Sequence, residues 1–240
     1  NPNLGRSVSA EWLGDELRKV QHSTGGAFQQ FLAKHLNVEI GTNLRHDRWA
    51  GADRWESQST QGLSLDEVIR RSEVVTIGID GGGLDDMLGL AVLGREAATG
   101  NWLLWSHAWL HRKALDLRKQ EAPRFLGFEK DGDLSIVNVA PEDVQALAAI
   151  VKRVDESGKL PAEKSIGLDP EKTHKVVYAA LIEAGISDDQ IIGIPQGWKL
   201  TGAITVVERK LDEGALWHGG SPLMAWCVGN AKVELRGNAL

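Results

Sequence analysis

The sequence predicts an α/β fold built on a mixed β-sheet, and three observations support this prediction. Three apolar runs of strand length follow one another closely after residue 73, and two further runs occur singly later in the chain. Helix signals, such as Pro141 followed by two acidic residues, separate the later runs. The length of 240 residues suffices for one sizeable domain with an additional segment.

The part of the chain ahead of residue 73 is predicted to be helical and rich in loops. Helices are expected over residues 9–21, 26–36 and 63–71, with Ser9 as the first cap. The stretch 41–62 is polar and rich in turn residues, which indicates a linker or surface loop. We therefore expect an interdomain segment over residues 1–72 and a second domain over residues 73–240.

The second domain is predicted to start with an antiparallel meander. Its three strands are expected at residues 74–80, 88–94 and 101–110, with short turns between them. Beyond them, strands are expected at 165–169, 191–195 and 232–236, and helices at 141–158, 172–184, 200–213 and 221–231. A meander followed by alternating strands and helices is the layout expected of an RNase H-like domain, with helices on the faces of the sheet.

Composition excludes several classes of protein. Apolar residues make up 42% and charged residues 25% of the chain, which argues against a disordered, collagen-like or coiled-coil protein. No apolar run is long enough to span a membrane, and residues 1–12 lack the apolar region of a signal peptide. Cys227, the only cysteine, is expected to pack inside a helix, so a cytosolic compartment fits. The net charge of −6 argues mildly against a nucleic-acid partner.

Acidic residues end two strands that this fold makes neighbours. Asp80 ends the first strand and Asp169 ends the strand at 165–169, so both carboxylates should project at one edge of the sheet. Asp86, which follows Asp80 across the turn 81–83, is a third candidate. Carboxylate oxygens suit hard cations such as Mg²⁺, and two such ions can activate a water against a phosphodiester. Because aspartate is also an ordinary turn residue, a purely structural role is the alternative.

Basic and aromatic residues give weaker signals. Lys199, close behind Gln196 and Gly197, and the backbone N–H groups at a helix N-terminus are a candidate phosphate-binding patch. A solvated charged face is the commoner explanation for basic residues in the helix that follows. The three tryptophans at 102, 105 and 109 are expected in the core or at an interface, with at least one partly exposed, because their spacing departs from strand alternation.

Taken in order, these motifs resemble the nuclease domain of the bacteriophage large terminase subunit, in its HK97-like branch. The matching segments are GIDGGGLDD with Asp80 and Asp86, GLDP with Asp169, PQG at 195–197, ERKLDEG, and WHGGSP. FLAKHLNV at 31–38 resembles the stretch that joins the family's ATPase domain to its nuclease domain. The resemblance covers nearly the whole chain and rests on the order and spacing of the motifs.

The resemblance implies an endonuclease that cuts concatemeric viral DNA with two Mg²⁺ or Mn²⁺ ions. By position, Asp80 and Asp169 would be metal ligands and Asp86 an accessory acid, while Gln196, Gly197 and Lys199 are the candidates for contacting double-stranded DNA. The family's third metal-binding acid lies on a helix expected beyond Leu240, so we expect weak or single metal occupancy.

The resemblance also implies a place in a DNA-packaging motor. The partners would be the portal protein, the small terminase subunit and further copies of the chain, in the cytoplasm of a bacterial host. An ATPase domain is expected upstream, since the sequence contains no phosphate-loop motif.

Two other functional classes remain open from the sequence. One half of an actin-like or sugar-kinase-like ATPase shares the meander and places an Asp-x-Gly turn, here Asp80–Gly82, against phosphates, but it requires a second, duplicated domain. A non-catalytic module that docks to the portal or the small subunit is compatible with a missing third acid. ATP binding would favour the first class, and metal titration with cleavage assays separates the second from a nuclease.

Overall fold

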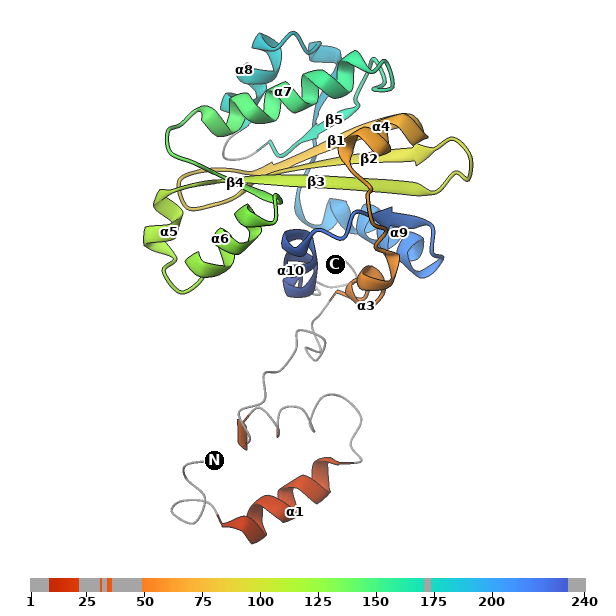
Figure 1. Ribbon diagram of the computed structural model, residues 1–240. Coiled ribbons are helices and arrows are strands. Elements are labelled where there is room, and N and C mark those ends of the chain that lie inside the picture. The colour runs from red at the N-terminus through yellow and green to blue at the C-terminus, as the bar shows by residue number, and fades with distance from the viewer. Residues whose placement is uncertain (1–8, 22–30, 32–33, 36–48, 171–173, 233–240) are drawn as a thin grey trace.

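The computed structural model describes residues 9–21, 31, 34–35, 49–170 and 174–232. In this part of the chain, a seven-stranded mixed sheet lies between two layers of helices, as Figure 1 shows. The predicted fold class is therefore confirmed. The first helix, α1 (Ala10–Val20), is capped by the Ser9 side chain as predicted. The helix predicted at 26–36 and the strand predicted at 232–236 lie almost entirely outside the described residues.

The sheet has the order β4-β3-β2-β1-β5-β6, and β7 pairs with β3. The strands are β1 (Ser72–Gly81), β2 (Leu88–Glu96), β3 (Trp102–His111), β4 (Leu134–Val137), β5 (Ile166–Leu168), β6 (Ile191–Gly193) and β7 (Leu216–His218). The first three form the predicted antiparallel meander, and the other pairings are parallel, so that β2 alone runs against the rest. β4 and β7, which have only four and three residues, were not predicted from the sequence.

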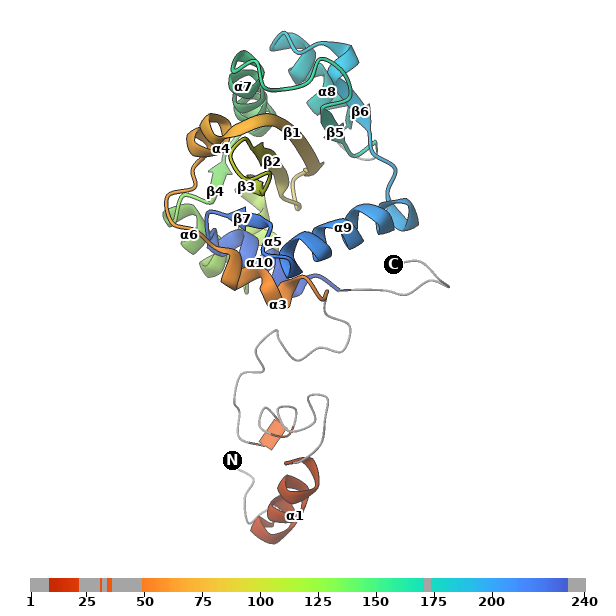
Figure 2. The ribbon, with the colours of Figure 1, turned by 90° about the vertical axis from the view of Figure 1, so that its right-hand side faces the viewer.

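One face of the sheet carries the main core. It is covered by α4 (Leu65–Arg71), α7 (Glu142–Glu156) and α8 (His174–Glu183), seen above the sheet in Figures 1 and 2. Alternate residues of β1 point into this layer: Val75, Ile77 and Ile79 are each at most 4% exposed. Leu147 and Val151, one helical turn apart on α7, are fully buried against them.

The opposite face is covered only in part. The helices on this side are α3 (Ala52–Trp55), α5 (Lys113–Leu117), α6 (Ala122–Lys130), α9 (Thr201–Asp212) and α10 (Pro222–Asn230). Their buried residues form two smaller clusters, one around Phe125 and Leu223 and one around Trp55 and Leu211. The cover over β1 and β2 is incomplete on this side, and the candidate site lies there.

The stretch predicted as a linker or surface loop is partly integrated into the fold. Trp55 is only 4% exposed and Ala52 only 6%, because α3 packs against α10. The expectation of a surface loop is therefore wrong for α3, which carries the buried Ala52 and Trp55, whereas residues 56, 57, 59, 61 and 62 are exposed as expected. The boundary between residues 72 and 73 stays a prediction, although α4 already packs on the sheet.

The tryptophans of β3 are positioned as expected. Trp109 is 3% exposed and lies in the main core, whereas Trp102 and Trp105 are half-buried. Both faces of this strand are covered near its end, so burial there does not alternate.

Candidate functional site

The two strand-end acids occupy equivalent positions on neighbouring parallel strands. Ile79 of β1 pairs with Leu168 of β5, and the N–H of Asp169 donates to the carbonyl oxygen of Ile79 at 3.3 Å. Both apolar residues point into the core beneath α7, so Asp80 and Asp169, one residue later, belong to the opposite, partly open face. The register thus brings together the two residues that the sequence singled out.

The chain leaves β1 through a glycine-rich turn, residues 81–83, that brings the following residues back beside the end of the strand. Gly81 has a φ of +80°, and a Cβ at this position would lie 2.2 Å from the carbonyl oxygen of Met87. The N–H of Gly82 donates to the same oxygen at 2.8 Å, which closes the turn. Asp86, whose carboxylate accepts from the N–H of Met87 at 2.9 Å, therefore lines the same pocket as Asp80.

Arg118 fastens this turn to the helical layer. Its Nε donates to the carboxylate of Asp85 at 2.9 Å, and its Nη2 donates to the carbonyl oxygen of Asp85 at 2.8 Å. The Asp85 carboxylate raises the pKa of the Arg118 guanidinium. Asp85 is thus held outward by a cation, while its neighbour Asp86 lines the pocket.

The pocket is a cleft of about 430 Å³ on the face opposite α7. Residues with small side chains form its floor on β1, β2 and β3: Gly78, Gly89, Ala91, Ser106 and Ala108. Leu223, Met224 and Cys227 of α10 contribute its wall. This floor was not predicted from the sequence, although its small residues alternate on β2 and on β3, as one face of a strand requires.

Cys227 does not have the buried position expected for it. Its side chain is exposed and lines the cleft opposite Asp80 and Asp86, because α10 turns its other face to the core through Leu223 and Val228. Partial enclosure by the cleft raises the pKa of the thiol, which keeps it in the neutral form.

His107 also borders the cleft, from β3. Burial lowers the pKa of its imidazole, and its Nε2 lies 2.9 Å from the hydroxyl oxygen of Ser135 on β4. Packing between Trp105 and Trp109 further fixes the ring. These contacts make His107 a support of the β3–β4 edge.

The described residues supply fewer ligands than a protein metal site usually has. Carboxylate oxygens are suitable donors for a hard divalent cation. However, the described residues contain no group of three or more His, Cys, Asp or Glu side chains placed to hold a metal ion. Asp169 is not among the residues that line the cleft but lies on the adjacent strand end.

The candidate DNA-contact residues follow β6. Gln196 precedes a short 3₁₀ helix, η4 (Gly197–Leu200), in which Gly197 has a φ of +73° and Lys199 is exposed. The amide of Gln196 donates to the carbonyl oxygen of Ile194 at 3.2 Å. The structure brings these residues to the same edge of the sheet as Asp169, but they do not line the cleft.

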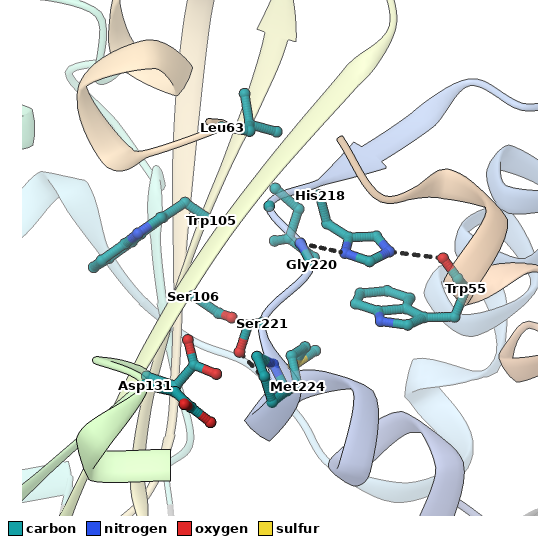
Figure 3. Close-up of a pocket in the computed structure, with 13 residues that line it drawn as sticks. Trp55, Leu63, Trp105, Ser106, Asp131, His218, Gly220, Ser221 and Met224 are labelled. Carbon is teal, nitrogen blue, oxygen red and sulfur yellow. Dashed lines mark hydrogen bonds between the residues drawn. The ribbon is translucent and has the colours of Figure 1, made fainter. Parts of the chain in front are cut away.

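The WHGG segment has a structural explanation. As Figure 3 shows, Nε2 of His218 donates to the carbonyl oxygen of Trp55 at 2.7 Å, and Nδ1 accepts from the N–H of Gly220 at 3.1 Å. A Cβ at Gly219 would lie 2.8 Å from the carbonyl oxygen of Leu63, so glycine is needed there. His218 therefore acts as a packing residue between the segment before β1 and the start of α10.

A second, smaller pocket of about 250 Å³ lies beside this contact. Trp105, Asp131 and Ser221 are among its lining residues (Figure 3). Asp133, also in its lining, accepts from the N–H of Leu223 at 3.0 Å and so satisfies a donor in the first turn of α10.

No helix in the described part of the chain has the length and apolar character that crossing a membrane requires.

Comparisons with known proteins bear on the fold. No family model matches the chain. Protein YmfN of Escherichia coli K12 is 22% identical over 243 residues, which cover 96% of this chain and 50% of the relative. The crystal structure of the HK97 bacteriophage large terminase matches with a TM-score of 0.59 and 18% identity, covering 96% of this chain and 45% of that one. The chain thus spans about half the length of each protein, and over that length it has the fold of the HK97 large terminase, which the sequence motifs predicted.

Proposed function

We propose that the chain is the nuclease part of a terminase-like DNA-packaging protein, and that it hydrolyses phosphodiester bonds of double-stranded DNA with Mg²⁺ or Mn²⁺. The observation that supports this proposal is the pairing of Ile79 with Leu168, because each of these residues is followed by one of the two acids on neighbouring parallel strands. The fold shared with the HK97 large terminase supports the same conclusion.

In this proposal Asp80 and Asp169 hold the metal ion, and Asp86 contributes from the glycine turn. A bound divalent ion would lower the pKa of a water and neutralise charge on the phosphodiester. The small residues of the cleft floor leave room for the sugar–phosphate backbone next to the carboxylates of Asp80 and Asp86. Because the described residues offer no group of three ligands, we propose that this chain by itself holds the metal weakly or at a single position.

The wider assignment follows from the same resemblance. We infer a motor that works in the cytoplasm of a bacterial host, with an ATPase domain, portal protein, small terminase subunit and further copies of the chain as its partners. The similarity of fold to a bacteriophage large terminase supports this inference, and pull-down with the portal and small subunit tests it.

Plasmid cleavage in the presence of Mn²⁺ tests the nuclease proposal. We expect Asp80→Asn and Asp169→Asn each to reduce nicking and linearisation at least 100-fold, and Asp86→Asn to reduce them less. Asp189→Asn is the matched control, because Asp189 is an exposed acid at the opposite end of β6. Unchanged cleavage by Asp80→Asn and Asp169→Asn would contradict the assignment.

A metal-binding readout separates a nuclease from the other classes. Fe²⁺ with ascorbate cuts the backbone near a bound ion, and we expect cuts close to residues 80 and 169 that Mn²⁺ suppresses. Metal binding without cleavage would favour a non-catalytic docking module, and tight ATP binding without metal-dependent cleavage would favour an actin-like ATPase.

A further inference from the structure

Trp198 differs from the other tryptophans of the described chain in its exposure. Its side chain is 68% exposed, whereas Trp55 and Trp109 are at most 4% exposed and Trp12 is 46% exposed. It is the most exposed of the large apolar side chains described. Exposing an indole forgoes the free energy that its burial would provide, so the position calls for an explanation.

The chain carries Trp198 onto the side of the sheet that holds the cleft. Gly167 of β5 belongs to this face, since its neighbours Ile166 and Leu168 are buried in the core on the other face. The side chain of Ile194 lies against Gly167, where a Cβ would approach it to 2.8 Å. The segment that leaves β6 therefore turns over the open face, four residues before Trp198.

The spacing of strands in the sheet gives the distance between β6 and β1, which carries Asp80. β6 lies two strands away from β1, which corresponds to about 10 Å at the usual strand spacing. Trp198 lies five residues beyond Gly193, the last residue of β6, which is at most about 18 Å of extended chain. The sum of the two lengths is shorter than one DNA turn of about 34 Å, so one DNA segment can contact the Asp80 edge and Trp198 together.

The neighbours of Trp198 favour a nucleic acid over a protein as the occupant. A tryptophan at the centre of a protein interface is normally ringed by further apolar groups. Here Gln196, two residues before Trp198, and Lys199, directly after it, are exposed polar residues, and the Lys199 ammonium lies 6.0 Å from the indole centroid. An exposed ring beside a cation suits a nucleotide, because the ring can stack on a base while the ammonium meets a phosphate.

Stacking on a side chain also restricts the form of the DNA. Within a duplex, each base face is already covered by its neighbours, so Trp198 can stack only on an unpaired or terminal base. We propose that Trp198 is a stacking platform for an unpaired base at a fork or single-stranded end of DNA bound along the cleft. This inference rests on the proposed function and adds the substrate form to it.

Photo-crosslinking tests the contact directly. The probe is forked DNA with 5-iododeoxyuridine in its unpaired arm, irradiated with the chain in EDTA so that cleavage is absent. We expect mass spectrometry to find the crosslink on the peptide that contains Trp198, and Trp198→Ala to abolish it. A crosslink found only elsewhere, or none, overturns the proposal.

Binding measurements test the preference for unpaired bases. By fluorescence anisotropy at low salt, we expect Trp198→Ala to weaken binding of the forked DNA about 5- to 150-fold, the range for loss of one stacked base. We expect a blunt duplex of the same sequence to bind within about 2-fold of wild type, because phosphate contacts remain. Trp198→Phe keeps the ring and should stay close to wild type on both DNAs.

Two controls complete the design. Trp12→Ala, at the other exposed tryptophan, should leave both affinities unchanged, and Lys199→Ala should weaken both alike. An equal loss on fork and duplex with Trp198→Ala, or no loss, contradicts stacking, including the case in which Trp198 docks a protein. Failure of the nuclease proposal would appear instead as no metal-dependent cleavage, or as cleavage independent of Asp80 and Asp169, and neither result affects the binding measured in EDTA.

Discussion

His218 donates a hydrogen bond from Nε2 to the carbonyl oxygen of Trp55 at 2.7 Å, and the two rings stack with 3.9 Å between their centroids. A carbonyl only accepts and the Gly220 N–H only donates, so Nε2 carries the proton and the ring is neutral. The contact joins α3 to the turn before α10, and α10 forms the wall of the cleft. A change in how α3 packs should therefore also change the shape of the cleft.

Mild acid should weaken this link. Burial lowers the pKa of His218 below its ordinary value of 6.5, while the unfolded chain titrates close to that value. The unfolded state then binds more protons as the pH falls below about 6.5, so the stability contribution present above that pH is progressively lost. Urea unfolding at pH 7.5 and 5.5 should show a lower free energy of unfolding at the lower pH.

The variant His218→Gln isolates this contribution. It should cost about 1–3 kcal/mol at pH 7.5, because the carbonyl of Trp55 or the N–H of Gly220 loses a buried partner. It should also make the free energy of unfolding differ less between pH 7.5 and pH 5.5. The difference that remains comes from His107, whose pKa is also lowered by burial. An undiminished pH difference in His218→Gln would show that His218 is not a source of it.

Sequence reasoning located the acids better than their surroundings. Asp80 lies in the last two residues of β1 and Asp169 directly follows β5, and apolar residues in both strands indicate where the strands are. Parallel neighbours end at one edge of the sheet, so the two acids could be expected there. Trp55 could not be placed, because its burial depends on α10, more than 160 residues away in the chain. The exposure of Cys227 was equally inaccessible, since a helix that is apolar on nearly all sides does not reveal which side meets the core.

Gly81→Ala should disturb the turn that brings Asp86 to Asp80. The residue has a φ of +80°, and its new Cβ would lie 2.2 Å from the carbonyl oxygen of Met87. The strained backbone and the close contact together should cost about 2–4 kcal/mol. Thermal unfolding measures this loss, and Mn²⁺-dependent cleavage should fall with it.

Gly100→Ala, in the turn between β2 and β3, is the matched control. Gly100 has a similar φ of +74°, but a Cβ there meets nothing within 4 Å. It should therefore lose only the free energy of the backbone strain, about 1–2 kcal/mol. Equal loss of stability in the two variants would mean that the contact with Met87 is not what requires glycine at 81.

Arg118→Ala should displace the turn that carries Asp86 while leaving the fold almost as stable. Its ion pair with Asp85 is exposed, so the free energy of unfolding should fall by no more than about 1 kcal/mol. Loss of both hydrogen bonds nevertheless releases the segment that carries Asp86, and Mn²⁺ affinity should drop several-fold in titration calorimetry. Arg70→Ala, which removes a similar exposed ion pair with Glu67 on α4, should leave Mn²⁺ affinity unchanged.

Filling the floor of the cleft should stop cleavage without harming the fold. Gly78 lies on β1 two residues before Asp80, and a Cβ at Gly78 would meet nothing within 4 Å. Gly78→Val should therefore leave the melting temperature unchanged or raise it by a few degrees, since valine suits a strand and restricts the unfolded chain. The added side chain occupies the space next to Asp80 that a DNA backbone needs, so plasmid cleavage should fall at least tenfold.

Thr76→Val is the control for this variant, because Thr76 lies on the same face of β1 but outside the cleft, and it should cleave normally. Full activity in Gly78→Val would mean that the substrate does not enter this cleft.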